Sequence, residues 1–95
     1  MSDRLTVRFI SVDKHISPIE CDAVRIPIAD SIKGEFSGSY GIKKGHAKAV
    51  FLLKKGEVIV TDVDKTIFKA EISDGFAKVE NNLISITVDK IEEKI

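Results

Sequence analysis

The chain has 95 residues, which is enough for one domain and no more. Lys plus Arg and Asp plus Glu number 15 each, and the longest basic runs are only pairs, so the sequence disfavours nucleic-acid binding. The single cysteine, Cys21, excludes an internal disulfide and a thiolate zinc site, and we expect it to be a small buried side chain. No apolar signal core and no segment near the ~20 apolar residues of a membrane span is present, which indicates a soluble cytoplasmic domain without direct membrane insertion.

Apolar and polar residues alternate with a period of two along most of the chain, which is typical of half-buried strands. In the first such segment Leu5, Val7 and Phe9 share one face. The same pattern predicts strands at residues 5–9, 19–28, 47–53, 57–60, 66–72, 76–79 and 84–88. Polar turns are expected at 62–65, at Asp74-Gly75 and at Asn81-Asn82.

Two of these segments also predict how their strands are placed in the sheet. Pro27 has no N–H to donate, so we expect the strand at 19–28 to run along a sheet edge or to carry a bulge. Segment 47–53, AKAVFLL, is apolar on both faces in its second half. That composition is typical of a strand covered on both sides.

Turn chemistry recurs about every 8–12 residues with no long amphipathic helix between the strands. We therefore predict an all-β fold for residues 1–88, an antiparallel β-sandwich or flattened barrel of about eight to ten short strands. Only DKIEEKI, residues 89–95, changes period. Ile91 and Ile95 are four apart and Asp89 can cap, so this segment predicts the start of a C-terminal helix.

The motifs of enzyme and nucleotide chemistry are absent. His15 and His46 lie outside any nucleophile motif, and we expect His15 to point to solvent. The segment 41–45 is followed by histidine where a phosphate-binding loop has lysine. A hydrolytic pair of His46 with Ser37 or Ser39 is the weakest alternative, because no acid stands at a spacing that would orient the histidine.

Asp62 and Asp64 stand at alternate positions, as at the start of a calcium loop. The central glycine and the closing glutamate of such a loop are lacking, so we expect a solvated hairpin turn. The sequence therefore predicts no catalytic residue, no metal site and no cofactor, and a protein that is not an enzyme.

The stretch YGIKKGHA, residues 40–47, departs from strand alternation. Gly38, Gly41 and Gly45 permit left-handed backbone or close approach by a neighbour, which indicates an ordered loop with sharp turns. One interpretation is purely structural: Tyr40 and Ile42 plug the edge of the core, and a histidine at such a corner hydrogen-bonds locally.

The longer segment SGSYGIKKGHAKAVFLLKKGEV resembles the signature of the F-type ATP synthase epsilon subunit, called delta in mitochondria. That family carries G-x-x-G-I-x-P-G-H-A-P, an apolar strand and a K-x-G turn. The resemblance continues through EISDGFAKVENNLISITVD, which is similar to the family's S-G-G-x-x-E-V-x-x-x-x-V-x-V-L-A-D strand pair. It covers nearly the whole chain in the family's order.

Three departures from the family pattern stand out. Lys44 and Lys48 replace prolines, which makes the loop more basic and less rigid. Ser39 replaces an acidic residue that faces the rotor ring in many members, and Asp30 or Glu35 is a candidate substitute. The family's C-terminal helical hairpin, which inhibits ATP hydrolysis in many bacterial relatives, has no counterpart before Ile95, so coupling without that inhibition is expected unless these residues are a piece of a longer chain.

The resemblance implies a non-catalytic central-stalk rotor subunit that clamps the gamma subunit to the membrane c-ring and so couples ion-driven rotation to ATP synthesis. It places the protein at the cytoplasmic face of the bacterial membrane, in a peripheral complex. The implied c-ring contacts are Gly38, Ser39, Tyr40, Gly41, Lys43 and Lys44. The implied gamma contacts are Ile42, Gly45, His46 and Ala47, together with an apolar face of the sandwich.

The alternative function is a small-ligand or carbohydrate-binding β-sandwich module. It rests on architecture alone, which does not define function. One tyrosine and no tryptophan leave few aromatic side chains for stacking on sugars.

Overall fold

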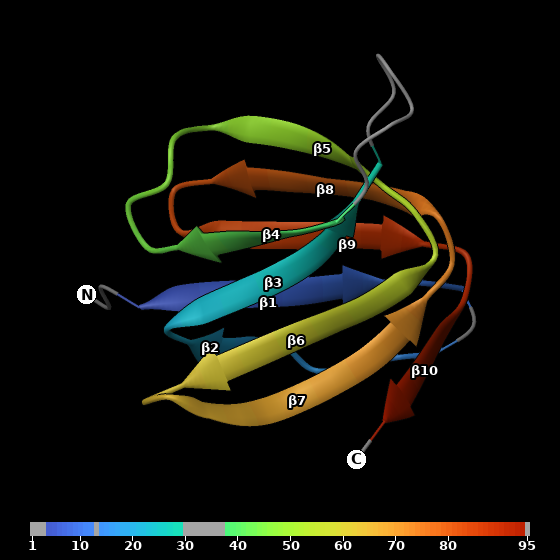
Figure 1. The fold of residues 1–95 in the computed structure, drawn as a ribbon, viewed down its shortest axis with the longest axis horizontal. Coiled ribbons are helices and arrows are strands. Elements are labelled where there is room, and N and C mark those ends of the chain that lie inside the picture. Colours follow the sequence, from blue (N-terminus) through green and yellow to red (C-terminus); the bar gives the residue numbers. More distant parts are fainter. Residues whose placement is uncertain (1–3, 13, 30–37, 95) are drawn as a thin grey trace.

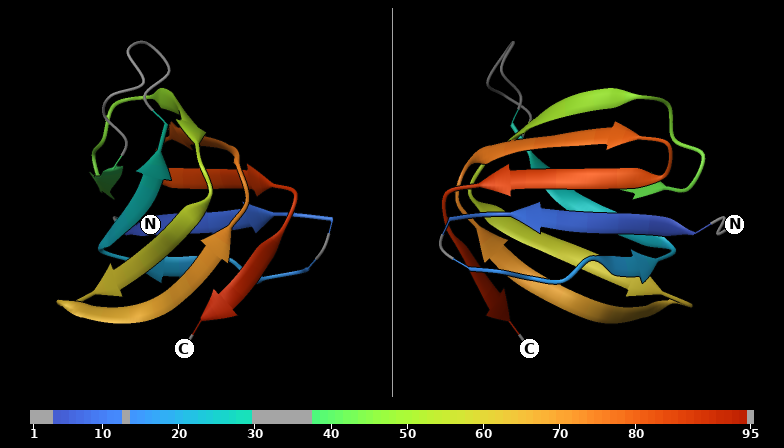
Figure 2. Two further views of the ribbon diagram at one scale, coloured as in Figure 1. Left: turned by 45° about the vertical axis from the view of Figure 1, so that its right-hand side comes forward. Right: turned by 180° about the vertical axis from the view of Figure 1, so that it is seen from behind.

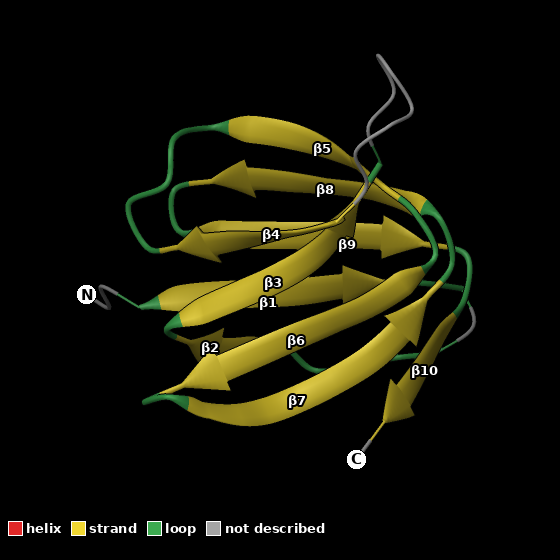
Figure 3. Ribbon diagram, in the orientation of Figure 1, coloured by secondary structure: helices red, strands yellow, loops and turns green. Residues whose placement is uncertain are grey.

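The structure, a computed structural model, describes residues 4–12, 14–29 and 38–94 (Figure 1). These residues form ten strands and no helix, which confirms the predicted all-β class and strand number (Figure 3). The strands are β1 (Leu5–Ile10), β2 (Ile19–Cys21), β3 (Ala23–Ile28), β4 (Gly38–Lys43), β5 (Ala49–Leu53), β6 (Gly56–Asp62), β7 (Lys65–Ile72), β8 (Gly75–Glu80), β9 (Leu83–Val88) and β10 (Ile91–Lys94).

One continuous sheet folds over on itself to make two layers. Its order is β10-β7-β6-β3-β5-β8-β9-β1-β2, and β4 pairs with β3. The fold-over lies at the short β3–β5 link, where Ile28 pairs with Leu53. One layer then holds β4, β3, β6, β7 and β10, and the other holds β5, β8, β9, β1 and β2 (Figures 1 and 2). All strand pairs are antiparallel as predicted except β1 with β9, which is parallel.

The core fills the space between the layers with the apolar faces that alternation predicted. The rings of Phe9 and Phe68 meet across it with centroids 5.3 Å apart. Cys21 is buried, as expected, and this burial raises the pKa of its thiol to about 11. The buried apolar side chains are Leu5, Val7, Phe9, Cys21, Val24, Ile26, Ile42, Leu53, Val58, Val60, Ala70, Ile72, Ala77, Val79, Ile84, Ile86, Val88 and Ile91.

The predicted turns are present, but they serve different connections. Val63-Asp64 and Asn81-Asn82 are two-residue hairpin turns with positive φ at all four positions. The Asp74-Gly75 turn instead carries the chain from β7 in one layer to β8 in the other. Gly75 is required there because a Cβ atom would lie 2.1 Å from the Thr87 carbonyl oxygen.

Segment 19–28 forms two strands, β2 and β3, separated at Asp22. Neither alternative predicted from Pro27 is found. β3 is not an edge strand, since it has β4 on one side and β6 then β5 on the other, and its regular register with β4 contains no bulge. Pro27 lies where that second neighbour changes: the β6 pairing ends at Arg25, and the β5 pairing begins at Ile28. The missing N–H is tolerated at this junction, and the Pro27 carbonyl accepts from the Lys54 N–H at 3.0 Å.

The predicted helix start at residues 89–95 was also wrong. Residues 91–94 form β10, which pairs antiparallel with β7 from Ile91 opposite Ile72 to Lys94 opposite Lys69. Ile91 is buried against the core, and the N–H of Lys90 donates to the Ser73 hydroxyl at 3.0 Å. The edge of β7 offers unpaired backbone groups to these residues, and pairing there also buries Ile91.

Candidate partner-binding site

The stretch YGIKKGHA folds as the second half of β4 followed by a tight turn, so the predicted loop is confined to its later residues. Tyr40 to Lys43 pair with β3, and the turn begins at Lys44. Gly45 has a φ of 82°, in the left-handed region that disfavours other side chains. The glycine is therefore needed at this position for the chain to leave β4 and enter β5.

Hydrogen bonds fix this turn to the rest of the sandwich. The Gly45 N–H donates to Asn82 Oδ1 at 2.7 Å, which ties the turn to the β8–β9 hairpin. His46 Nδ1 lies 2.7 Å from the Ala47 carbonyl oxygen, and its Nε2 lies 2.9 Å from the Tyr40 hydroxyl. Because a carbonyl only accepts, Nδ1 carries the proton and Nε2 accepts from Tyr40 in the neutral ring. These contacts hold the turn in one geometry.

Three rings close the open edge between β4 and β5. The ring centroids of Tyr40 and Phe51 are 4.9 Å apart, and His46 packs edge-on against both. Ile42, two residues after Tyr40 on β4, has 0% of its surface exposed. Ile42 thus fills the core as the structural interpretation predicted, whereas Tyr40 is 36% exposed and packs against Phe51 and His46. Since Ile42 is fully buried, it cannot contact a partner at the surface, and the prediction that placed it there is wrong.

Ser39 and His46 do not bond to each other in the contacts of the described residues. Ser39 accepts a hydrogen bond from Arg25 Nη1 at 3.0 Å, while His46 is engaged by Tyr40 and Ala47. Ser37 lies outside the described residues, as do Asp30 and Glu35, the candidate acidic contacts. His15 is exposed, as expected.

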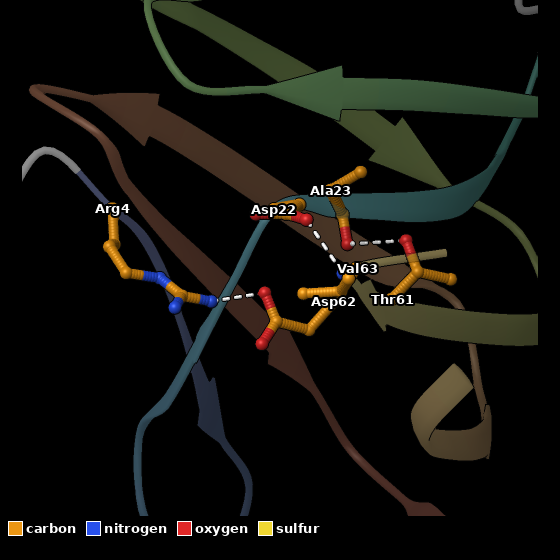
Figure 4. A network of polar contacts seen from close by, with 6 residues as sticks. All are labelled: Arg4, Asp22, Ala23, Thr61, Asp62 and Val63. Atoms are coloured by element: carbon orange, nitrogen blue, oxygen red, sulfur yellow. Dashed lines mark hydrogen bonds and ion pairs between the residues drawn. The ribbon is translucent and has the colours of Figure 1, made fainter. Parts of the chain in front are cut away.

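The predicted Asp62–Lys65 turn belongs to a polar network that joins three elements (Figure 4). Arg4 makes an ion pair with Asp62, and the N–H of Val63 donates to Asp22 Oδ2 at 2.7 Å. The Thr61 hydroxyl donates to the Ala23 carbonyl at 3.4 Å. Within the described parts of the chain, no group of three or more His, Cys, Asp or Glu is placed to hold a metal ion. The network fastens the β6–β7 hairpin to the β2–β3 corner.

A groove of about 410 Å³ runs over the outer face of β4, β3 and β6, beside the turn. We call it the cationic groove. Its lining residues are Ala23, Val24, Arg25, Gly41, Lys43, Lys44, Gly45, His46, Ile59 and Thr61. Members of the two predicted contact sets therefore lie together: Gly41, Lys43 and Lys44 share one groove with Gly45 and His46. The residues predicted to contact two different partners therefore share one surface, the cationic groove.

The second surface is an exposed apolar face on the opposite layer, which sequence reasoning misassigned. Val50 and Leu52 of β5 are 66% and 56% exposed, so β5 is not covered on both sides as predicted. Strand register places Leu52, Phe76, Thr87 and Ile10 in one row across β5, β8, β9 and β1. Phe76 and Ile10 in this row are 45% and 43% exposed. We call Ile10, Val50, Leu52 and Phe76 the apolar face. In the sequence, its signal is the pair of apolar residues on the outward side of segment 47–53.

Polar residues border the apolar face. Arg8, Lys78 and Ser85 occupy the next row across the same strands, level with Val50. Arg8 Nη2 donates to the Ser85 hydroxyl at 3.4 Å, and Lys78 pairs with Glu80 at 3.7 Å. An apolar centre with a polar border is the usual anatomy of a protein interface.

Comparison with known proteins identifies the family. The family described as "ATP synthase, Delta/Epsilon chain, beta-sandwich domain" matches residues 4–94, almost the whole chain. This chain belongs to that family. The chloroplastic ATP synthase epsilon chain of Porphyra purpurea is 32% identical over 89 residues, which is 94% of this chain and 60% of that relative. The ATP synthase epsilon chain of Campylobacter fetus is 38% identical over 52 residues, 55% of this chain and 40% of the relative.

Chains in two solved structures share the fold. A chain in the Euglena gracilis mitochondrial ATP synthase structure, which contains OSCP, F1 and c-ring, superposes with a TM-score of 0.78 at 21% identity, covering 98% of this chain and 55% of that one. A chain in the Tetrahymena thermophila structure of the central stalk and c-ring gives a TM-score of 0.68 at 12% identity, covering 92% and 64%. The chain spans 40–60% of the length of the curated relatives cited above. The described residues hold no helix long and apolar enough to cross a membrane.

Proposed function

We propose that this chain is a rotor subunit of the central stalk of an F-type ATP synthase, where it joins the gamma subunit to the membrane c-ring. It couples ion-driven rotation of the ring to ATP synthesis and catalyses no step itself. Membership of the delta/epsilon family supports this function. The observation that carries it is a single sandwich with two separate surfaces, the cationic groove on one layer and the apolar face on the other.

The apolar face is the proposed gamma contact. Val50, Leu52 and Phe76 lie close together on β5 and β8, and exposed apolar patches rimmed by polar residues mark protein–protein contacts. Removing such side chains from water contributes roughly 25 cal/mol per Å² of apolar surface. Ile42 is buried and is therefore not part of this contact. The assignment of His46 and Ala47 to the gamma contact rests on the family resemblance alone.

The end that carries the turn is the proposed ring contact, with Ser39, Lys43 and Lys44 exposed on it. A contact that transmits torque has to resist deformation. The bonds from Gly45 to Asn82 and from His46 to Tyr40 supply that stiffness by fastening the turn to β9's hairpin and to β4. Attached in this way, the complex is peripheral at the cytoplasmic face of a bacterial membrane.

Co-purification with the gamma subunit from the same source tests the function. The unaltered chain should form a stoichiometric complex, and Leu52→Asp or Phe76→Asp should reduce gamma binding by at least about tenfold, because each buries a charge in the contact. Ile67→Asp is the matched control, since Ile67 of β7 is similarly exposed at 47% but lies in the other layer. A folded chain that fails to bind its gamma subunit contradicts the proposal.

The turn is tested separately, by co-purification with the c-ring from the same source. Gly45→Val forces a β-branched side chain into the left-handed region, and His46→Ala removes the anchor to Tyr40. Both should weaken ring binding more than Asp64→Asn, a change in the β6–β7 hairpin outside the groove lining. Equal effects of all three changes would mean that the turn has no special part in assembly.

A further inference from the structure

The charge of the cationic groove is not balanced by its own lining. Arg25, Lys43 and Lys44 stand around it, and none of the lining residues is acidic. Register adds Lys69, which lies opposite Ile59 on the neighbouring strand β7. A chain of zero net charge therefore concentrates positive charge on one outer surface.

Nearby carboxylates are mostly engaged elsewhere. Asp62 pairs with Arg4, and Glu80 pairs with Lys48 at 3.4 Å and with Lys78 at 3.7 Å. Asp22 accepts the Val63 N–H, although its charge also interacts with Lys44. Among the described residues just named, Asp22 is the carboxylate that interacts with a groove cation, at the Lys44 end.

The shape of the groove leaves room for small groups to enter. Its floor includes Ala23 and Gly41, and a Cβ added at Gly41 would meet no atom within 4 Å. Ile59 and Thr61 form the side on β6. Carboxylate side chains entering from above would meet cations on β3, on β4 and in the turn.

The backbone argues against a phosphate site. Phosphate sites in turns depend on N–H groups that point at the anion. Here the Gly45 N–H donates to Asn82 and the His46 N–H donates to the Lys43 carbonyl at 3.3 Å. Nucleic acid is disfavoured as well, because the one ring in the lining, His46, is packed against Tyr40 and Phe51.

We infer that the cationic groove receives carboxylate side chains from an acidic protein segment. This inference rests on the proposed function only for the identity of the partner, which would be the polar loops of the ring. Many family members have an acidic residue where this chain has Ser39, whereas here the acidic side chains would belong to the partner and the cations to this subunit. Ser39 is bonded to one of these cations, Arg25. Each exposed pair contributes little, so the contact becomes strong only when a ring presents many loops.

Nuclear magnetic resonance on the 15N-labelled chain tests the inference. The probe is a blocked peptide, Gly-Asp-Glu-Asp-Glu-Gly, and its matched control is Gly-Asn-Gln-Asn-Gln-Gly, both at low salt. The acidic peptide should shift the amide signals of Ala23, Gly41 and Gly45 with a millimolar Kd, and the amide peptide should not. Lys43→Gln with Lys44→Gln should weaken binding about fivefold, as expected for two exposed ion pairs.

The other basic pair of the sequence supplies the control variant. Lys54→Gln with Lys55→Gln removes the same charge away from the groove lining and should leave the Kd within about twofold. Equal loss in both double variants, equal binding of the two peptides, or saturation by inorganic phosphate at lower concentration than the acidic peptide would each overturn the inference. If the acidic peptide does not bind but gamma does, the inference about the groove is wrong and the proposed rotor function stands. If the peptide binds but gamma does not, the rotor function is wrong and the inference about the groove stands.

Discussion

At the scale of single residues, the two hairpin turns differ in how well their side chains suit positive φ. Asn81 and Asn82 adopt φ of 54° and 62°, and asparagine tolerates that region well. Val63 adopts 51° with a β-branched side chain that is 73% exposed. Val63 therefore carries backbone strain without burial to offset it.

Replacing Val63 with asparagine should relieve that strain. We expect Val63→Asn to raise the free energy of unfolding by about 1 kcal/mol in urea denaturation. The N–H bond to Asp22 is a backbone bond and is kept. Val12→Asn, at a fully exposed position where no positive φ occurs, should change stability by less than about 0.5 kcal/mol. Equal effects of the two changes would show that the turn is unstrained.

Asp22 predicts a pH dependence. The Val63 N–H that donates to its carboxylate lowers the pKa of Asp22 below 3.8, with smaller contributions from Asp62, Arg4 and Lys44. A carboxylate with a depressed folded pKa stabilises the fold above its unfolded pKa of about 3.9, and this contribution is lost as pH falls through the folded value. The stability gap between the unaltered chain and Asp22→Asn should therefore shrink below about pH 4 in urea denaturation. A gap that is constant from pH 7 to 3 would contradict this origin.

At the scale of elements, β10 shows how a short segment takes its structure from its neighbour. Ile91 of the chain end is buried opposite Ile72, while Glu92, Glu93 and Lys94 are exposed. Lys94 lies 3.8 Å from Glu71 and 3.6 Å from Glu92, which suits charged residues on an edge strand.

Truncating the side chain of Ile91 measures how much the packing of β10 against β7 contributes to the free energy of unfolding. Ile91→Ala should lower the free energy of unfolding by about 2–3 kcal/mol, because a buried isoleucine leaves a cavity between β10 and β7. Glu93→Ala, at an exposed position of the same strand, should cost less than about 0.5 kcal/mol. Were residues 91–94 helical or detached, the two changes would have similar small effects.

At the scale of the whole molecule, the fold-over of the sheet turns the apolar face and the cationic groove in different directions. The apolar face lies on β5, β8, β9 and β1, and the groove lies on β4, β3 and β6. One hydrophobic core lies between the two layers and joins the two surfaces. A subunit that bridges two partners needs this arrangement.

Independence of the two surfaces follows from their separation. Leu52→Asp should reduce gamma binding and leave acidic-peptide binding within about twofold, while Lys43→Gln with Lys44→Gln should do the opposite. Both readouts can be taken on the same purified chains, with thermal unfolding as the check of folding. A change on one surface that abolishes both interactions without unfolding would show that they are a single site.

The sequence by itself determined which faces of the strands are apolar, where the hairpins turn and which family the chain resembles. These properties are local: alternation shows the two sides of a strand, and Asn81-Asn82 or residues 62–65 mark turns through their own chemistry. The resemblance rests on the same local spacing of glycines and histidine, and the match over residues 4–94 confirms it.

Only the tertiary structure decided which apolar faces are covered. Val50 and Leu52 look like core in the sequence, yet no strand of the described chain lies over them. Pro27 suggests an edge but lies at a change of neighbours, and Ile91 suggests a helix but pairs with β7. The groove likewise joins residues from 23 to 61 in the sequence. Burial and pairing depend on what lies across the sheet, and that is set by contacts between distant segments that no local pattern encodes.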